Sequence, residues 1–218
     1  MKKTLSTLLL LAGMSVAQAQ DVKLPAVNMK QQSKSVVQTL ATRHSVREFG
    51  TRKLTNQELS NLCWAACGVS RDAEHRTSPT AMNKKEIRLF VLTADKVYEY
   101  MPAQNTLRHI ADGDHRKLLA SNGGNGGFSQ DFVNQAPVSL VMVIDYELFG
   151  SQNETAMMMG CVDAGNVSEN INLYCESVGL VTVPRATHDV AGLRKLLKLT
   201  DKQLPIMNNP VGFPKGTK

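Results

Sequence analysis

Apolar side chains recur at helical spacing along several stretches of the chain. Residues 35–42, 56–66 and 189–199 each carry an apolar stripe with the period of an α-helix, so each stretch predicts an amphipathic helix. Residues 155–178 form the longest stretch, and their apolar side chains fall on several sides of the predicted helix. A helix with that pattern is typical of a buried core element or of an oligomer interface.

Short apolar runs rich in β-branched residues lie between these helices. They predict strands at 87–93, 96–101, 106–110, 137–145 and 205–213. Helices and strands are mixed without strict alternation. We therefore predict an α+β fold with a central, mixed or mainly antiparallel sheet flanked by helices, rather than a doubly wound sheet. Residues 114–120 predict a short helix, and the glycine-rich segment 121–127 predicts either a mobile lid or a plain loop.

The N-terminus has the features of a secretory signal peptide. A charged start is followed by the apolar run 5–16 and by Ala17-Gln18-Ala19, a small-residue cleavage pattern. The run is too short for a transmembrane helix, so stable membrane insertion is not expected, although an uncleaved anchor is the alternative. We predict a signal peptide over 1–19 and export, with the periplasm as the expected compartment. Residues 20–34 are polar and aperiodic and predict an N-terminal arm before a single domain, 35–218.

The charge balance is mildly basic, with a formal net charge of +6 for the full chain. Cleavage after residue 19 would remove Lys2 and Lys3 and no acidic residue, so the excess would fall by two. No basic stripe interleaved with aromatic residues is present in the sequence, so nucleic acid is not an expected partner. A modest positive excess suits a small anionic ligand.

The sequence does not decide whether any of the four cysteines form a disulfide. Cys63 and Cys67 are one turn apart on a predicted helix, where Cα atoms lie about 6 Å apart, yet helical Cβ directions suit a disulfide poorly. Cys161 and Cys175 would be about 21 Å apart along a helix and cannot pair there. We favour buried free thiols, and a Cys63–Cys67 bridge stays possible in an oxidising compartment. No metal site is predicted, because no Cys or His pair has zinc-ligand spacing with a second pair behind it.

The segment 43–49, Arg-His-Ser-Val-Arg-Glu-Phe, concentrates groups that bind phosphate. Arg43 and Arg47 offer planar forks of donors, and Ser45 adds a hydroxyl. The alternative is a solvated basic turn before a helix, since Thr55 and Glu58 form a capping-box pattern just downstream.

Four segments of the chain resemble motifs of the nitroreductase family of flavin enzymes, in the family's order. They are Arg43–Phe49, Ser78–Asn83, the stretch from Asp163 through Gly179-Leu180, and Val211–Pro214. The resemblance spans about residues 36–216. It implies an FMN-dependent nitroreductase-like fold and a homodimer whose active sites are shared between the two chains.

The resemblance also implies roles for individual residues. Arg43 and Ser45 match positions that bind the FMN phosphate, and Arg47 matches the basic residue at the pyrimidine edge of the flavin. His44 matches a position that contacts the ring largely through its backbone. Asn83 matches a second ring-edge anchor, although the Q-P that usually follows is Lys-Lys-Glu in this chain.

Further cofactor contacts are implied near the C-terminus. In the family, the turn that includes Pro184, Ala186 and Thr187 presents backbone N–H groups toward flavin N5. Ala186 stands where an acid is common, and Arg185 beside it could meet an anionic substrate. Lys215 matches a basic position that completes the phosphate grip.

The function implied is that of an FMN-dependent oxidoreductase. It would transfer two electrons, or a hydride, through flavin N5 to or from a small organic substrate. The flavin carries that chemistry, so no catalytic side chain is predicted. The electron donor stays open, because an exported enzyme would not meet NADH or NADPH at useful concentration. The segment from Val97-Tyr98-Glu99-Tyr100 to Leu107-Arg108 also resembles an element of azoline-forming dehydrogenases of the same superfamily, which keeps a substrate-oxidising role open. The alternative is an exported flavin-binding or interaction protein without turnover.

Overall fold

The computed structural model describes residues 20–121 and 129–217. The predicted signal peptide and most of the glycine-rich segment lie outside these residues. The described chain forms a seven-stranded antiparallel sheet in the order β1-β4-β3-β2-β5-β7-β6. The strands are β1 (Val22–Lys23), β2 (Ile87–Thr93), β3 (Lys96–Met101), β4 (Thr106–Asp112), β5 (Val138–Asp145), β6 (Val181–Thr182) and β7 (Gln203–Gly212). The predicted α+β class and antiparallel sheet are confirmed.

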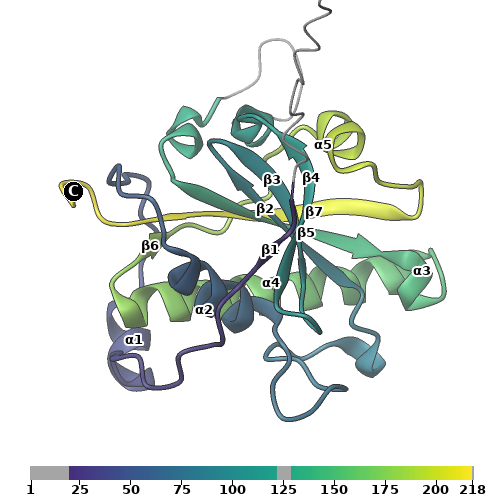
Figure 1. Ribbon diagram of the computed structural model, residues 1–218. Helices are drawn as coiled ribbons and strands as arrows, with labels where there is room; N and C mark the ends of the chain where they lie inside the picture. Colours follow the sequence, from purple (N-terminus) through teal and green to yellow (C-terminus); the bar gives the residue numbers. More distant parts are fainter. Residues whose placement is uncertain (1–19, 122–128, 218) are drawn as a thin grey trace, which may run out of the picture.

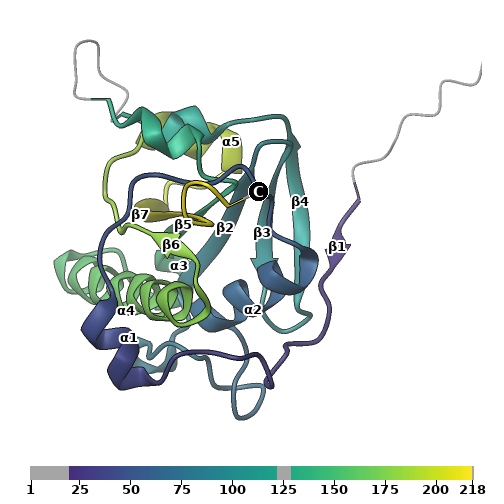
Figure 2. The same ribbon diagram turned by 90° about the vertical axis from the view of Figure 1, so that its left-hand side faces the viewer.

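Helices cover both faces of the sheet (Figures 1 and 2). They are α1 (Val36–Thr42), α2 (Asn56–Cys67), α3 (Tyr146–Phe149), α4 (Glu154–Val178) and α5 (Val190–Leu197), with 3-10 turns at Ala81–Asn83, Arg116–Leu119 and Asp131–Asn134. Leu89 and Val91 of β2 pack on the side of α2 and α4. Phe90 and Leu92 pack on the side of α5. The alternation of side chains along one central strand therefore builds two cores.

Local sequence explains where the helices begin and end. The Thr55 side chain accepts from the Glu58 N–H and the Glu58 carboxylate accepts from the Thr55 N–H, so the predicted capping box is present. Asn153 caps the start of α4, and Gly179 ends it in the left-handed conformation at φ 79°. The predicted short helix at 114–120 is instead a 3-10 turn, Arg116–Leu119.

Gly68 follows the last residue of α2 and does not have the left-handed conformation common at helix ends. Its φ is −69°, which any residue can adopt. What requires glycine is the close approach of Trp64, because a Cβ at position 68 would lie 2.4 Å from Trp64 Cδ1. The indole nitrogen of Trp64 donates to the Val69 carbonyl at 2.7 Å. Trp64 therefore secures the end of its own helix.

The N-terminal arm is joined to the sheet. Val22 and Lys23 pair with Leu107 and Thr106 at the outer edge of β4, and Leu24 is buried. Asn28 N–H donates to the side chain of Asn61 on α2 at 2.9 Å. Among the described helices, none has the length and hydropathy needed to cross a bilayer.

The short helix α1 exposes its apolar side chains. Val36, Val37 and Leu40 are 71%, 77% and 59% exposed, whereas Thr39 is the helix's buried residue. On α4, Met158 and Val162 are also more than half exposed, while its other face packs on the sheet and on α2. The apolar pattern correctly predicted both helices, but part of that pattern faces outward in a single chain.

Candidate functional site

Three segments that are far apart in sequence lie side by side at one end of the sheet (Figure 2). Val46 N–H donates to the Thr182 carbonyl at 3.0 Å, and Gly50 N–H donates to the Phe213 carbonyl at 2.8 Å. A Cβ at Gly50 would lie 2.8 Å from the carbonyl oxygen of Pro214, so only glycine allows this approach. These contacts bring together segment 43–49, the turn after β6 and the C-terminal segment.

The predicted cationic residues lie at the surface of this junction. Arg43 is partly exposed, with its Nε 3.9 Å from a Glu169 carboxylate oxygen. Arg47 and Ser45 are exposed, and neither side chain makes a hydrogen bond within the described part of the chain. Lys215 Nζ lies 3.3 Å from Glu48, and both are well exposed. Donors that are solvated in this way remain available to an anion.

His44 is held against its own backbone. Its Nδ1 lies 2.9 Å from the carbonyl oxygen of Thr42, and the side chain is exposed. The ring is therefore tied to the end of α1, and a backbone contact is the kind of contact that this position can offer.

The turn after β6 presents unused backbone donors. Arg185 N–H pairs with the Asn208 carbonyl, but the N–H groups of Ala186 and Thr187 find no acceptor among the described residues. Pro184 and Thr187 are half-buried and Ala186 is exposed. Asn208 Nδ2, from the buried strand β7, donates to the Thr187 carbonyl at 3.0 Å and so holds the turn against the sheet. Two free N–H groups on a fixed turn can bind an acceptor atom of a ligand.

Arg185 is buried and does not reach the surface, where the sequence led us to expect that it could meet an anionic substrate. Its residue is only 6% exposed, and its guanidinium points inward. Nη1 donates to the Asn208 side chain at 2.7 Å, and Nη2 donates to the Leu119 carbonyl at 2.8 Å. The side chain is therefore part of the support behind the turn.

Asn83 lies apart from the other predicted cofactor residues. Its loop is anchored where Ala81 N–H donates to Asp163 of α4 at 2.6 Å, whereas the Arg43 segment approaches α4 near Asn172. Along α4, Asp163 is about 9 Å from Glu169, which lies beside Arg43, and about 14 Å from Asn172. No described contact joins Asn83 to the other sites within one chain.

The Asn83 loop is held in an unusual backbone conformation. Met82, Asn83 and Lys85 have φ values of 50°, 55° and 56°, which L-residues adopt rarely. Such conformations are maintained only where the surroundings impose them, and they cluster at ligand-binding sites. Beneath the loop, Thr80 Oγ1 donates to the buried carboxylate of Glu86 at 3.0 Å.

Glu86 and Asp163 form a buried acid pair under this loop. Burial, followed by the hydrogen bond and the charge of Asp163, raises the pKa of Glu86 to about 7. Glu86 Oε1 has no hydrogen-bond partner among the described residues, so the protonated, uncharged form of this carboxyl is the form that burial favours. In the sequence, Glu86 stood out only as a departure from the family motif.

Comparison with known proteins identifies the group to which this chain belongs. The sequence pattern of the Nitroreductase family matches residues 40–213, a range that includes the first three motifs and the fourth up to Phe213. The chain is a member of the nitroreductase family. A Methanocaldococcus jannaschii protein named as a nitroreductase is 30% identical over 185 residues, covering 79% of this chain and 88% of that protein.

Solved structures agree with this assignment. A nitroreductase from Ralstonia eutropha has a TM-score of 0.81 and 28% identity, with 91% of each chain covered. The E. coli microcin synthetase McbBCD complex contains a chain with a TM-score of 0.64 at 18% identity, covering 96% of this chain and 84% of that one. The second likeness shows a shared fold. Family membership supports an oxidoreductase role for this nitroreductase-family protein.

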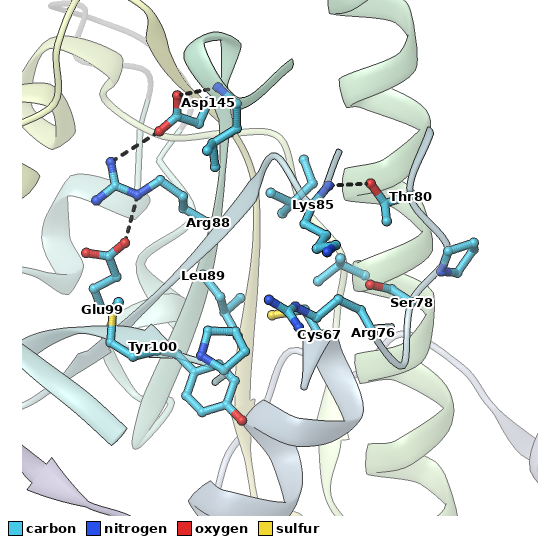
Figure 3. Close-up of a pocket in the computed structure, with 16 residues that line it drawn as sticks. Cys67, Arg76, Ser78, Thr80, Lys85, Arg88, Leu89, Glu99, Tyr100 and Asp145 are labelled. Carbon is cyan, nitrogen blue, oxygen red and sulfur yellow. Dashed lines mark hydrogen bonds and ion pairs between the residues drawn. The ribbon is translucent and has the colours of Figure 1, made fainter. Parts of the chain in front are cut away.

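A cavity of about 230 Å³ opens beside the Asn83 loop (Figure 3). Ser78, Thr80 and Lys85 line one side, and Arg88 lines the other with its two carboxylate partners. By contrast, the cavity between Arg43 and the β6 segment measures only about 10 Å³. The residues expected to hold a cofactor therefore form an open surface in one chain.

The cysteines are free in the structure, as favoured from the sequence. Cys63, Cys67 and Cys175 are buried, and Cys161 is partly exposed. Burial raises the pKa of the Cys67 thiol to about 12, so this thiol is protonated and unreactive at neutral pH. Within residues 20–121 and 129–217, no group of three His, Cys, Asp or Glu residues is arranged to hold a metal ion.

Asn208 supports the candidate site and was not predicted from the sequence. It is fully buried on β7 and supports both Arg185 and Thr187. The available signal was the Asn208-Asn209 pair inside a predicted buried strand, because buried amides need partners.

Proposed function

We propose that this protein is an FMN-dependent oxidoreductase that transfers two electrons, or a hydride, to or from a small organic substrate. The observation that carries this proposal is the convergence of unused donors at one end of the sheet. The segment with partly exposed Arg43 and exposed Ser45 and Arg47 is hydrogen-bonded, through Val46 and Thr182, to the strand that leads to the free N–H groups of Ala186 and Thr187. Such a set suits a ligand with a phosphate at one end and hydrogen-bond acceptors at the other.

The donor chemistry fits FMN. Arg43, Ser45 and Lys215 would hold the phosphate through charge-assisted bonds. Arg47 would face the pyrimidine edge, and the backbone N–H groups of Ala186 and Thr187 would donate to the ring edge at N5. Bound FMN would supply the electron-transfer chemistry, while the protein positions the ring and sets its electrostatic surroundings.

Arg43→Ala should weaken FMN binding about 10- to 100-fold, because one charge-assisted contact is worth about 1.5–3 kcal/mol. Fluorescence titration of the apoprotein measures this directly. Lys195→Ala, which removes an exposed cation on α5, is the matched control and should leave the affinity unchanged. Equal affinities for wild type and Arg43→Ala would show that the phosphate lies elsewhere.

We also propose that two copies form an obligate homodimer. The apolar side chains of α1 and the Met158–Val162 stripe of α4 leave apolar surface exposed on neighbouring helices. Exposed apolar patches of this kind mark interaction sites. The separate position of Asn83 supports the same arrangement, because a second copy could bring its Asn83 loop to the open cofactor surface.

Val37→Asp should convert the dimer to a monomer and release FMN together with it. A charge placed in an apolar interface loses its hydration without a partner, and a ligand that binds only the dimer is lost when the dimer separates. Light scattering at low micromolar concentration and the flavin absorbance report the two effects. Val190→Asp, at an exposed valine of α5, is the control. A wild-type monomer that still holds FMN would refute the shared site.

Export is the remaining part of the proposal. Residues 1–19 carry the signal-peptide pattern, so mature protein should begin at Gln20. The intact mass of periplasmic material tests this, and a mass that includes residues 1–19 would contradict it.

The alternative, a flavin-binding protein without turnover, is separated by redox assays. Dithionite should bleach the bound flavin under anaerobic conditions, and a panel of acceptors should reoxidise it. An enzyme reoxidises with at least one organic acceptor at a rate well above that of free FMN, whereas a simple carrier does not.

A further inference from the structure

Arg185 is a buried cation without an acidic partner in the described chain. Its guanidinium donates only to neutral oxygens, namely Gln130 Oε1 at 2.7 Å, Asn208 Oδ1 at 2.7 Å and the Leu119 carbonyl at 2.8 Å. It also lies over the Phe132 ring, 5.4 Å from the ring centre. These contacts fix the group in place but leave its charge uncompensated.

Two other arginines with little exposure, the half-buried Arg88 and the buried Arg116, are paired with acids. Arg88 pairs with Glu99 and Asp145, and Arg116 pairs with Asp114. A buried charge without a counter-charge is costly to maintain. Its retention beside a functional turn therefore calls for a reason other than stability.

The surroundings of Arg185 are net positive. Burial, and next the charge of Arg47, lower the pKa of Arg185 to about 10, so it stays charged at neutral pH. His188, also buried, has its pKa lowered by burial and by Arg185. The nearby acid, Asp189, caps α5 by accepting from Gly192 N–H at 2.9 Å.

Asn208 connects this charge to the turn. Its Oδ1 accepts from the guanidinium, and its Nδ2 donates to the Thr187 carbonyl at 3.0 Å. The buried cation is thus held directly behind the unused N–H groups of Ala186 and Thr187. A rigid positive charge at that point acts on any electron-rich group that the turn binds.

We propose that Arg185 sets the reduction potential of the bound flavin through its uncompensated charge. This inference rests on the proposed FMN site. A cation near the ring stabilises the reduced, anionic form more than the oxidised form, so it raises the potential. The uncharged side chain of Ala186 leaves this effect unopposed.

The test compares FMN-loaded wild type with Arg185→Gln and Arg185→Lys by equilibrium titration against a reference dye. Arg185→Gln should lower the ratio of reduced to oxidised flavin at least tenfold at a fixed potential, which is about 30 mV for a two-electron couple. Arg185→Lys keeps the charge and should stay near the wild-type value. A purely structural role predicts that both variants behave alike, and that result would overturn the inference.

A second pair of variants keeps the test decisive if Arg185→Gln does not fold. Ala186 is exposed, so substitution there leaves the core packing intact. Ala186→Glu should lower the potential by opposing the cation, and Ala186→Gln should not. Equal potentials for this pair would overturn the inference.

A flavin-free measurement completes the experiment. In the apoprotein, an NMR titration should show a higher pKa for His188 in Arg185→Gln than in wild type, because Arg185 disfavours the charged imidazole. An unchanged His188 pKa would overturn the inference, because it would show that the charge of Arg185 does not act on neighbouring groups. Wild type that binds no FMN would refute the proposed function as well, whereas bound FMN with an unshifted potential would refute only the role of Arg185.

Discussion

Arg88→Met should lower the free energy of unfolding by about 3 kcal/mol. Arg88 Nε donates to Glu99 at 2.7 Å, and Arg88 Nη1 lies 3.6 Å from Asp145. Both acidic residues are only 5% exposed. Removing one partner from a buried ion pair typically costs 3–5 kcal/mol, because a desolvated charge is left behind. The lower end applies, since Glu99 keeps Arg108 and Asp145 keeps Gln203.

Urea unfolding at pH 7 measures this loss. The control is Arg108→Met, because Arg108 binds the same Glu99 from a position where its side chain is 47% exposed. An exposed partner contributes less than about 1 kcal/mol. If the two variants were equally stable, the buried pairing of Arg88 would not be the stabilising element.

Glu86→Gln should make the protein more stable than wild type at pH 8 but not at pH 4. Burial, followed by Asp163, raises the folded-state pKa of Glu86 from 4.5 to about 7. Between these values the folded state retains a proton that the unfolded state has released. The contribution of Glu86 to stability is therefore complete below pH 4.5 and is lost as the pH rises through 7. The loss amounts to about 3 kcal/mol at most.

Glutamine at position 86 stays neutral at every pH, and its amide can donate to Asp163 while its oxygen accepts from Thr80. The difference in unfolding free energy between wild type and variant, measured by urea titration from pH 4 to pH 8, isolates this group from all others. Glu74→Gln is the control, because the Glu74 side chain is 73% exposed. A difference that does not change with pH would show that Glu86 has an ordinary pKa.

The apolar patterns predicted the main elements well because burial imposes those patterns. β5 is buried along its whole length, and its continuous apolar run was sufficient to predict it. By contrast, β1 and β6 are two-residue strands that exist through pairing with distant partners, and no local pattern marks them. The solvent exposure of Val37 could not be predicted either, because periodicity reveals an apolar helix face but not whether another element covers it.

The candidate site was predicted in its residues but not in its geometry. The segment with Arg43 and the turn with Thr187 were both indicated by motif, and the structure places them together through Val46 and Thr182. The inward course of Arg185 could not be predicted, since it depends on Asn208 and Leu119 from distant segments. Long-range hydrogen bonds of this kind have no signature in a single sequence.

The two-residue strand β1 has a consequence for how molecules of this protein meet one another. It occupies the outer edge of β4, so the backbone groups of Thr106 and Leu107 already have partners. A chain beginning after Leu24 would present that edge as a template on which strands of other molecules could add. We therefore expect such shortened chains to form fibrous or amorphous deposits on storage while intact ones stay dispersed. The first few residues of the arm therefore cover an edge strand and protect the protein from self-association.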